Sequence, residues 1–262
     1  MSILLESNKE LITCRKALVE SSIDLYKTVF AELKPIPAKP HYTFNPRDLF
    51  RMLQGILMAS AKQIRSKSSL LKLWLHEGMR SFHDRLVDEA DRSWVKEKLL
   101  ELKKVRWRVS KDEDLLEPGA LMYGAYLRRG LPAEEQRYEE VPDPRETLPR
   151  LMGEYLSEYN SMHEPLAMSF FWDAVEHISR LARAVRPARG SAMLIGVGGS
   201  GQQPIARLAS YICGHTFEQV EPRKGYGVSE FREDLKKLYT RAGQGGEPLF
   251  VVFNEPEERF LA

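Results

Sequence analysis

The chain has 262 residues, of which 43% are hydrophobic and 29% are charged, and its formal net charge at pH 7 is +2. This composition is ordinary for a soluble globular protein, and the near-neutral charge gives no electrostatic argument for a nucleic-acid partner. No apolar run is long enough to span a bilayer, so no membrane partner is expected. The N-terminus lacks the layout of a signal peptide, which favours a cytosolic or cytoskeletal location, and Cys14 and Cys213 are expected to be reduced structural thiols.

The first hundred residues predict only helices. Apolar residues recur at helical spacing over residues 3–34 and 68–88, and a charged helix is expected near residues 92–104. Another helix should begin between the first two, because Asn45 suits an N-cap and Pro46 suits the first helical position. This part of the sequence therefore indicates an all-helical region.

The pattern changes after these helices. Trp107 and Val109 alternate with arginines and predict a short strand, and a long section punctuated by proline and glycine follows. Helices are then expected at about residues 148–160 and 165–186. This section separates the helical region from a part of different character.

The last part of the sequence alternates strands with helices. Strands are predicted at Ala192–Ile195, Phe217–Val220 and Leu249–Phe253, with helices at about residues 205–212 and 229–242 between them. This alternation predicts an α/β fold with a parallel sheet. A doubly wound sheet needs more strands than these, so the sequence is expected to be a piece of a larger unit, with an unpaired sheet edge and exposed apolar surface.

The most informative motif joins the first predicted strand to the helix after it. Its spacing matches the G-x-x-x-x-G of a phosphate-binding loop up to the second glycine. The candidate binding residues are Gly196, Val197, Gly198, Gly199, Ser200, Gly201, Gln202 and Gln203. Glycines allow backbone N–H groups to close around a phosphate, and the N-terminus of the following helix adds partial positive charge. The sequence therefore predicts the geometry of such a loop.

The charged and metal-binding groups of such a loop are missing. Gln202 stands where a lysine is expected, Gln203 stands where a serine or threonine would ligate magnesium, and Pro204 follows. A glycine-rich turn without function is the alternative interpretation of the motif.

No other cluster predicts a catalytic residue or a metal ligand. His76 and Glu77 lack the second histidine of a zinc-binding helix, so zinc is not supported. His177, beside Glu176 and Asp173, is interpreted as a histidine packed near the sheet.

Several longer blocks resemble one family, the dynein heavy chains, and above all their axonemal members. Residues 171–183 are similar to the helix before the loop of the fourth AAA+ module, and residues 196–201 are similar to that loop itself, including its Val-Gly-Gly. Upstream, residues 41–49 resemble the helical lid of the third module. Shorter matching blocks lie at residues 73–77, 84–87, 91–94, 208–214 and 231–239, so the resemblance covers nearly the whole chain.

The resemblance implies two domains. Residues 1–104 would be the lid of the third module, and residues 105–262 would be a partial P-loop core of the fourth, a three-layer structure with a parallel sheet that is incomplete at its C-terminal end. Arg47 matches the second sensor arginine of such lids and is added to the candidate nucleotide-binding residues, the alternative being a surface arginine. Residues 121–126 would line an adenine pocket or simply pack in the interior.

The resemblance also implies the function of the parent protein. The family forms rings of AAA+ modules that convert ATP hydrolysis into minus-end-directed movement along microtubules in cilia and flagella. The implied partners are the other modules of the ring and, through the full-length parent, intermediate chains, light chains and microtubules. The implied location is the cytoplasm and cytoskeleton, in the axoneme of a cilium or flagellum.

Departures from the family pattern argue against catalysis in this segment. The fourth module usually has a lysine or arginine at the place of Gln202 and a serine at that of Pro204, and its acidic strand usually ends in a Thr-Asp-like pair where this chain has Asn254-Glu255. A neutral amide in place of a cation forfeits a charge-assisted contact of about 1.5–3 kcal/mol. We therefore expect no hydrolysis, weak or absent binding of ATP or ADP, and no magnesium. The segment is interpreted as a regulatory nucleotide-binding region, the alternative being a dynein-like structural or interaction protein that binds no nucleotide.

Overall fold

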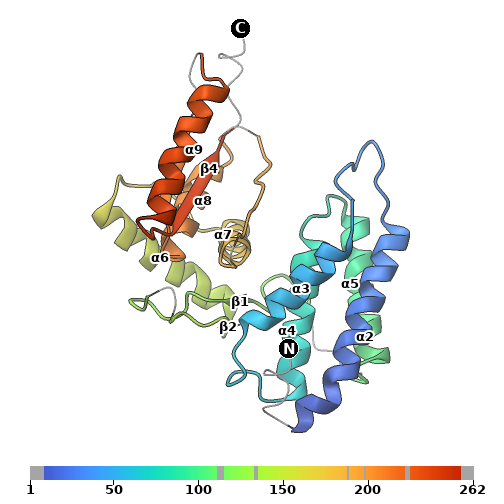
Figure 1. The fold of residues 1–262 in the computed structure, drawn as a ribbon. Helices are drawn as coiled ribbons and strands as arrows, with labels where there is room; N and C mark the ends of the chain where they lie inside the picture. Colours follow the sequence, from blue (N-terminus) through green and yellow to red (C-terminus); the bar gives the residue numbers. More distant parts are fainter. Residues whose placement is uncertain are drawn as a thin grey trace. The chain divides into compact units, whose positions relative to one another are not determined.

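The computed structural model describes residues 9–110, 115–132, 135–187, 189–197, 199–221 and 225–254. The chain divides into two compact units, which are described separately (Figure 1). The first unit comprises Met1–Arg128 and Gln136–Leu148, and the second comprises Arg129–Glu135 and Pro149–Ala262. In the described part of the chain, no helix combines the length and the apolarity that crossing a membrane requires.

The first unit is built from helices packed around one apolar core, as the sequence predicts. Its helices are α2 (Lys9–Glu32), α3 (Pro46–Met58), α4 (Lys67–Gly78) and α5 (Glu89–Val105), and a π-helical turn, η1 (Met79–His83), continues α4. Each of the other helices packs against α2, and α3 and α5 also contact α4 and η1. The core residues of α2 recur every seven or four positions, which places them on one face of the helix: Leu11, Leu18, Leu25 and Val29.

The predicted start of α3 is confirmed at the level of hydrogen bonds. The Asn45 side chain accepts a bond from the backbone N–H of Arg47 at 2.9 Å. The carboxylate of Asp48 in turn accepts a bond from the backbone N–H of Asn45 at 2.9 Å. Pro46 occupies the first helical position, where its missing N–H costs nothing. These contacts satisfy donors that the first turn of a helix would otherwise leave unpaired.

The strand predicted around Trp107 and Val109 is wrong. Residues 106–110 form a turn and irregular chain in which Arg108 has a φ of 50°. Trp107 is a core residue whose ring centre lies 5.8 Å from that of Trp74. Its indole N–H donates to Ser21 Oγ at 3.0 Å, just as that of Trp74 donates to Ser22 Oγ at 3.0 Å. Packing against α2 therefore decides the conformation here, and the alternation of apolar and charged residues does not.

The first unit also includes a small hairpin beyond the helices. Strands β1 (Tyr123–Gly124) and β2 (Glu139–Glu140) pair in antiparallel fashion, and Tyr138 bridges to Ala59 at the end of α3. Helix α6 (Pro144–Met162) follows, beginning in the first unit and continuing in the second. The compact first unit thus includes β1, β2 and the start of α6, while the end of the lid at residue 104 stays a prediction from the family resemblance.

The second unit alternates helices and strands, as predicted for the C-terminal part. Its elements after α6 are α7 (Trp172–Val185), α8 (Gln202–Ile212), β3 (Thr216–Val220), α9 (Val228–Gly243) and β4 (Leu249–Phe253). Strands β3 and β4 are parallel, in a register that runs from Thr216 opposite Leu249 to Val220 opposite Phe253. The buried core lies between α7 and α8, on which Val175, Ile178, Leu208 and Ala209 are fully covered.

The strand predicted at Ala192–Ile195 is not formed. These residues are irregular chain without a ladder partner among the described residues, and Met193 and Ile195 are 83% and 87% exposed. Among the described residues, the sheet of this unit contains only β3 and β4, which pair with each other. Because a β-strand exists only through hydrogen bonds to a neighbour, an apolar run without one stays irregular. The described sheet is thus smaller than the predicted three-layer core.

The surfaces expected to be open are open in the described residues. Strand β4 pairs with β3 on one side only, and the large apolar side chains of Met193, Ile195, Val197 and Phe253 are exposed. The two thiols are buried and free, as expected. Burial raises the pKa of Cys213 to about 12, so this thiol is chemically inert near neutral pH.

Candidate functional site

The glycine loop turns directly into the first residue of α8. Gly199 and Gly201 have φ values of 81° and 82°, in the left-handed region that L side chains rarely adopt. The backbone N–H of Ser200 donates to the carbonyl of Val197 at 3.1 Å, which closes the turn. Gly201 is the N-cap residue of α8. Gly199 and Gly201 thus have the left-handed conformation that such a loop needs, whereas Gly198 lies outside the described part of the chain, so the phosphate-binding geometry stays a prediction.

The loop offers backbone donors and no cation. Gln202 and Gln203 are the first two residues of α8, and their N–H groups lie in the first turn, where a helix has no internal acceptors for them. Pro204 contributes no N–H, and the N–H of Ile205 already donates to the carbonyl of Gly201 at 3.1 Å. A phosphate here would be held by loop and helix N–H groups alone. These residues suit an anion, but none carries the hydroxyl that would ligate magnesium at position 203 or 204.

Two further predictions concern Arg47, whose expected partner is nucleotide in the third module, and the acidic pair Asn254-Glu255. Arg47 belongs to the first unit, where it is exposed in the first turn of α3. Asn254 follows β4 and is partly exposed, and Glu255 lies outside the described residues. The described residues test neither the role of Arg47 nor that of the acidic pair, so both stay predictions.

The segment that was considered for an adenine pocket is packed in the first unit. Leu121, Met122, Tyr123, Ala125 and Tyr126 are all buried. Tyr123 lines a pocket that it shares with residues of α4 and β2 and of the turn before α4. The packed alternative is therefore the one that the burial supports.

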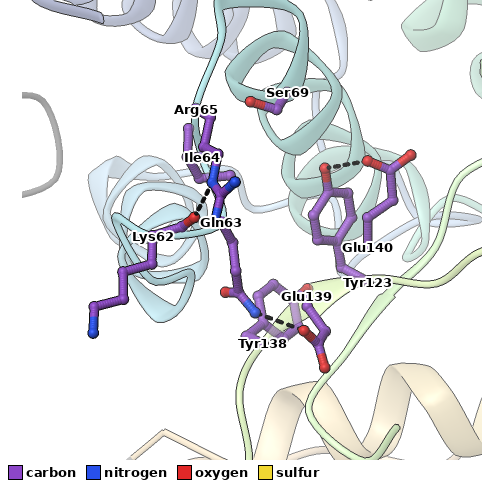
Figure 2. A pocket seen from close by; sticks show the side chains of 9 residues that line it. All are labelled: Lys62, Gln63, Ile64, Arg65, Ser69, Tyr123, Tyr138, Glu139 and Glu140. Atoms are coloured by element: carbon purple, nitrogen blue, oxygen red, sulfur yellow. Dashed lines mark hydrogen bonds between the residues drawn. The ribbon is translucent and has the colours of Figure 1, made fainter. Parts of the chain in front are cut away.

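The pocket beside Tyr123 has a volume of about 250 Å³, and its acidic side chains already have partners (Figure 2). Glu139 accepts from Gln63 Nε2 at 2.7 Å and from Arg128 Nε at 3.1 Å. Glu140 accepts from Lys72 Nζ at 2.8 Å and from Tyr123 Oη at 3.4 Å. Burial, followed by the nearby Glu140 carboxylate, raises the pKa of Tyr123 well above its usual range. We interpret this pocket as the place where β1 and β2 are attached to the helices of the first unit, because its carboxylates already accept hydrogen bonds from side chains of the same unit.

A buried polar cluster adjoins this pocket, since Tyr123 and Tyr138 contact both. The Glu77 side chain on α4 is fully buried and accepts a hydrogen bond from Tyr138 Oη at 2.6 Å. His76 Nδ1 lies 3.2 Å from the same carboxylate oxygen, and the His76 and Tyr123 ring centres are 5.2 Å apart. Sequence reasoning rejected zinc at His76-Glu77 but missed this cluster. The signal that was available is a charged residue that follows the apolar run Leu73-Trp74-Leu75 in the part of α4 that is buried.

The histidine expected to be packed near the sheet is exposed. His177 lies on the outer face of α7, since the buried residues of that helix are on the opposite face. Glu176 forms an ion pair with Arg180 of 2.7 Å, one turn further along α7. Within the described part of the chain, no group of three or more histidine, cysteine or acidic residues is arranged to hold a metal ion.

Comparison with known proteins decides the family. A family model for the dynein heavy chain ATPase lid domain matches residues 1–92, and one for the P-loop containing dynein motor region D4 matches residues 166–259. The chain belongs to the dynein heavy chain family. The lid model covers α2, α3, α4 and η1, and the D4 model covers α7 to β4. The helical first unit and the small sheet with its helices thus fit a dynein lid followed by part of an AAA+ module.

The dynein relatives are much longer than this chain. It is 36% identical over 249 residues to dynein axonemal heavy chain 6 of Homo sapiens, with 94% of the chain and 6% of that relative aligned. It is 39% identical over 249 residues to dynein axonemal heavy chain 1 of Homo sapiens, with 93% and 6% aligned. Identity to the dynein beta chain, flagellar outer arm, of Chlamydomonas reinhardtii is 34% over 238 residues, with 91% and 5% aligned. The chain therefore spans about one-twentieth of the length of the curated relatives it matches.

Proposed function

We propose that this dynein segment contains a regulatory site that binds ATP or ADP weakly through its glycine loop and does not hydrolyse it. The observation that carries the proposal is the start of α8, where a left-handed glycine leads into Gln202, Gln203 and Pro204. The turn and the free N–H groups suit a phosphate. The groups that would neutralise charge during phosphoryl transfer, a lysine and a hydroxyl-held metal, have no counterpart at these positions.

The expected loss of phosphate affinity follows from the contacts that the loop lacks. Each charge-assisted hydrogen bond contributes about 1.5–3 kcal/mol. Loss of the cation alone therefore weakens phosphate binding by roughly tenfold to a hundredfold. Binding without turnover is the consequence, because transfer of a phosphoryl group requires stabilisation that binding does not.

A non-catalytic structural or interaction role without any nucleotide is the second candidate. The exposed loop favours it, since Val197 is 80% exposed and no side chain with a positive charge lies in the loop or the first turn of α8. The chain would then act through its surfaces alone.

The location and partners of the parent protein are part of the same proposal. The relatives are named as axonemal heavy chains and as a flagellar outer-arm chain. We propose that this chain works in the axoneme of a cilium or flagellum, as part of an ATP-driven, minus-end-directed microtubule motor. Its direct neighbours would be other AAA+ modules of the dynein ring, while intermediate chains, light chains and microtubules would be reached through the full-length protein.

Titration of the 262-residue chain with ATP and ADP, with and without magnesium, separates the two candidates. We expect weak binding that magnesium does not strengthen, and no phosphate release above background. The matched variant Gly201→Val forces a β-branched residue into the left-handed region and should abolish binding. Binding that persists in this variant would not come from the loop. Magnesium-dependent hydrolysis that the variant abolishes would refute the proposed inactivity.

A further inference from the structure

We draw no further inference here: the strongest candidate, the exposed apolar chain at Met193, Ile195 and Val197 before the glycine loop, together with the side of β4 that has no partner among the described residues, carries no proposal because nothing in the described part of the structure shows what covers it.

Discussion

In the first unit, helices α2 to α5 enclose two tryptophans completely, whereas in the second unit helix α9 has no buried residue at all. In the first unit the two buried indole N–H groups donate to serine hydroxyls of α2. The second unit leaves one side of β4 unpaired among the described residues and exposes the apolar chain before the loop. The comparison teaches that the lid is closer to a self-sufficient structure, and that the loop region depends on contacts beyond those that its described residues provide.

The largest effect is expected from truncating the core of the first unit. Trp74→Ala removes a fully buried indole and its bond to Ser22, so the free energy of unfolding should fall by about 3–5 kcal/mol. Phe50→Ala on α3 is the control, since Phe50 is 65% exposed and should change stability by less than about 0.5 kcal/mol. Urea unfolding measures both. Similar losses in the two variants would mean that the first unit has no specific core of this kind.

A smaller effect should follow from removing one hydroxyl of the buried cluster. Tyr138→Phe leaves the fully buried Glu77 carboxylate without the bond that it accepts at 2.6 Å, which should cost about 1–3 kcal/mol of unfolding free energy. The matched control is Tyr239→Phe on α9, whose residue is 70% exposed. A loss below about 0.5 kcal/mol in Tyr138→Phe would show that this hydrogen bond does not fasten the hairpin to α4.

The exposed apolar chain of the second unit should promote self-association. We expect the isolated chain to be marginally stable and to associate, and Ile195→Asp to weaken association about tenfold by placing a charge on the exposed surface. Val87→Asp, at an exposed residue of the first unit, is the control. Light scattering over a concentration series, with thermal unfolding alongside, measures this. A monodisperse chain with a sharp, high unfolding transition would show that the second unit needs no partner.

The smallest effect concerns alkaline pH. Burial raises the pKa of the Cys213 thiol from 9.0 to about 12, so the folded state retains a proton that the unfolded state loses between these values. The stabilising contribution is complete below pH 9 and is lost as the pH rises towards 12, which predicts a decrease of about 1 kcal/mol in unfolding free energy from pH 8 to pH 10. Cys213→Ala should reduce this pH dependence in urea unfolding. Burial also raises the pKa of Tyr155, to about 12. This tyrosine should cause part of the pH dependence that remains in Cys213→Ala.

Local sequence signals predicted most of the fold. The cap of α3 at Asn45 and the helical spacing on α2 were readable because each depends on neighbours in the sequence. The apolar runs of β3 and β4 were correctly predicted as strands because each run has the other as its partner. The errors at residues 107–109 and 192–195 have a different origin. In both places the local pattern suited a strand, but strand formation requires a partner that the local pattern does not contain.

The candidate site was predictable in part for the same reason. The left-handed glycines and the start of α8 follow from the motif, and the absence of a lysine at position 202 is visible in the sequence. The pairing of Glu77 with Tyr138 joins residues 61 positions apart, so no local pattern reveals it.

That pairing also sets an order of events during synthesis of the chain. At about 5–20 residues per second on a ribosome, Tyr138 is made several seconds after Glu77. The lid helices can form and dock in that interval, because α2 to α5 all precede Tyr138 in the chain. Until Tyr138 is made, the Glu77 carboxylate has the His76 ring beside it but lacks the hydrogen bond that the tyrosine donates. The last step in closing the first unit is therefore the docking of the hairpin, and a chaperone that recognises unfinished lids would find this face of α4 open longest.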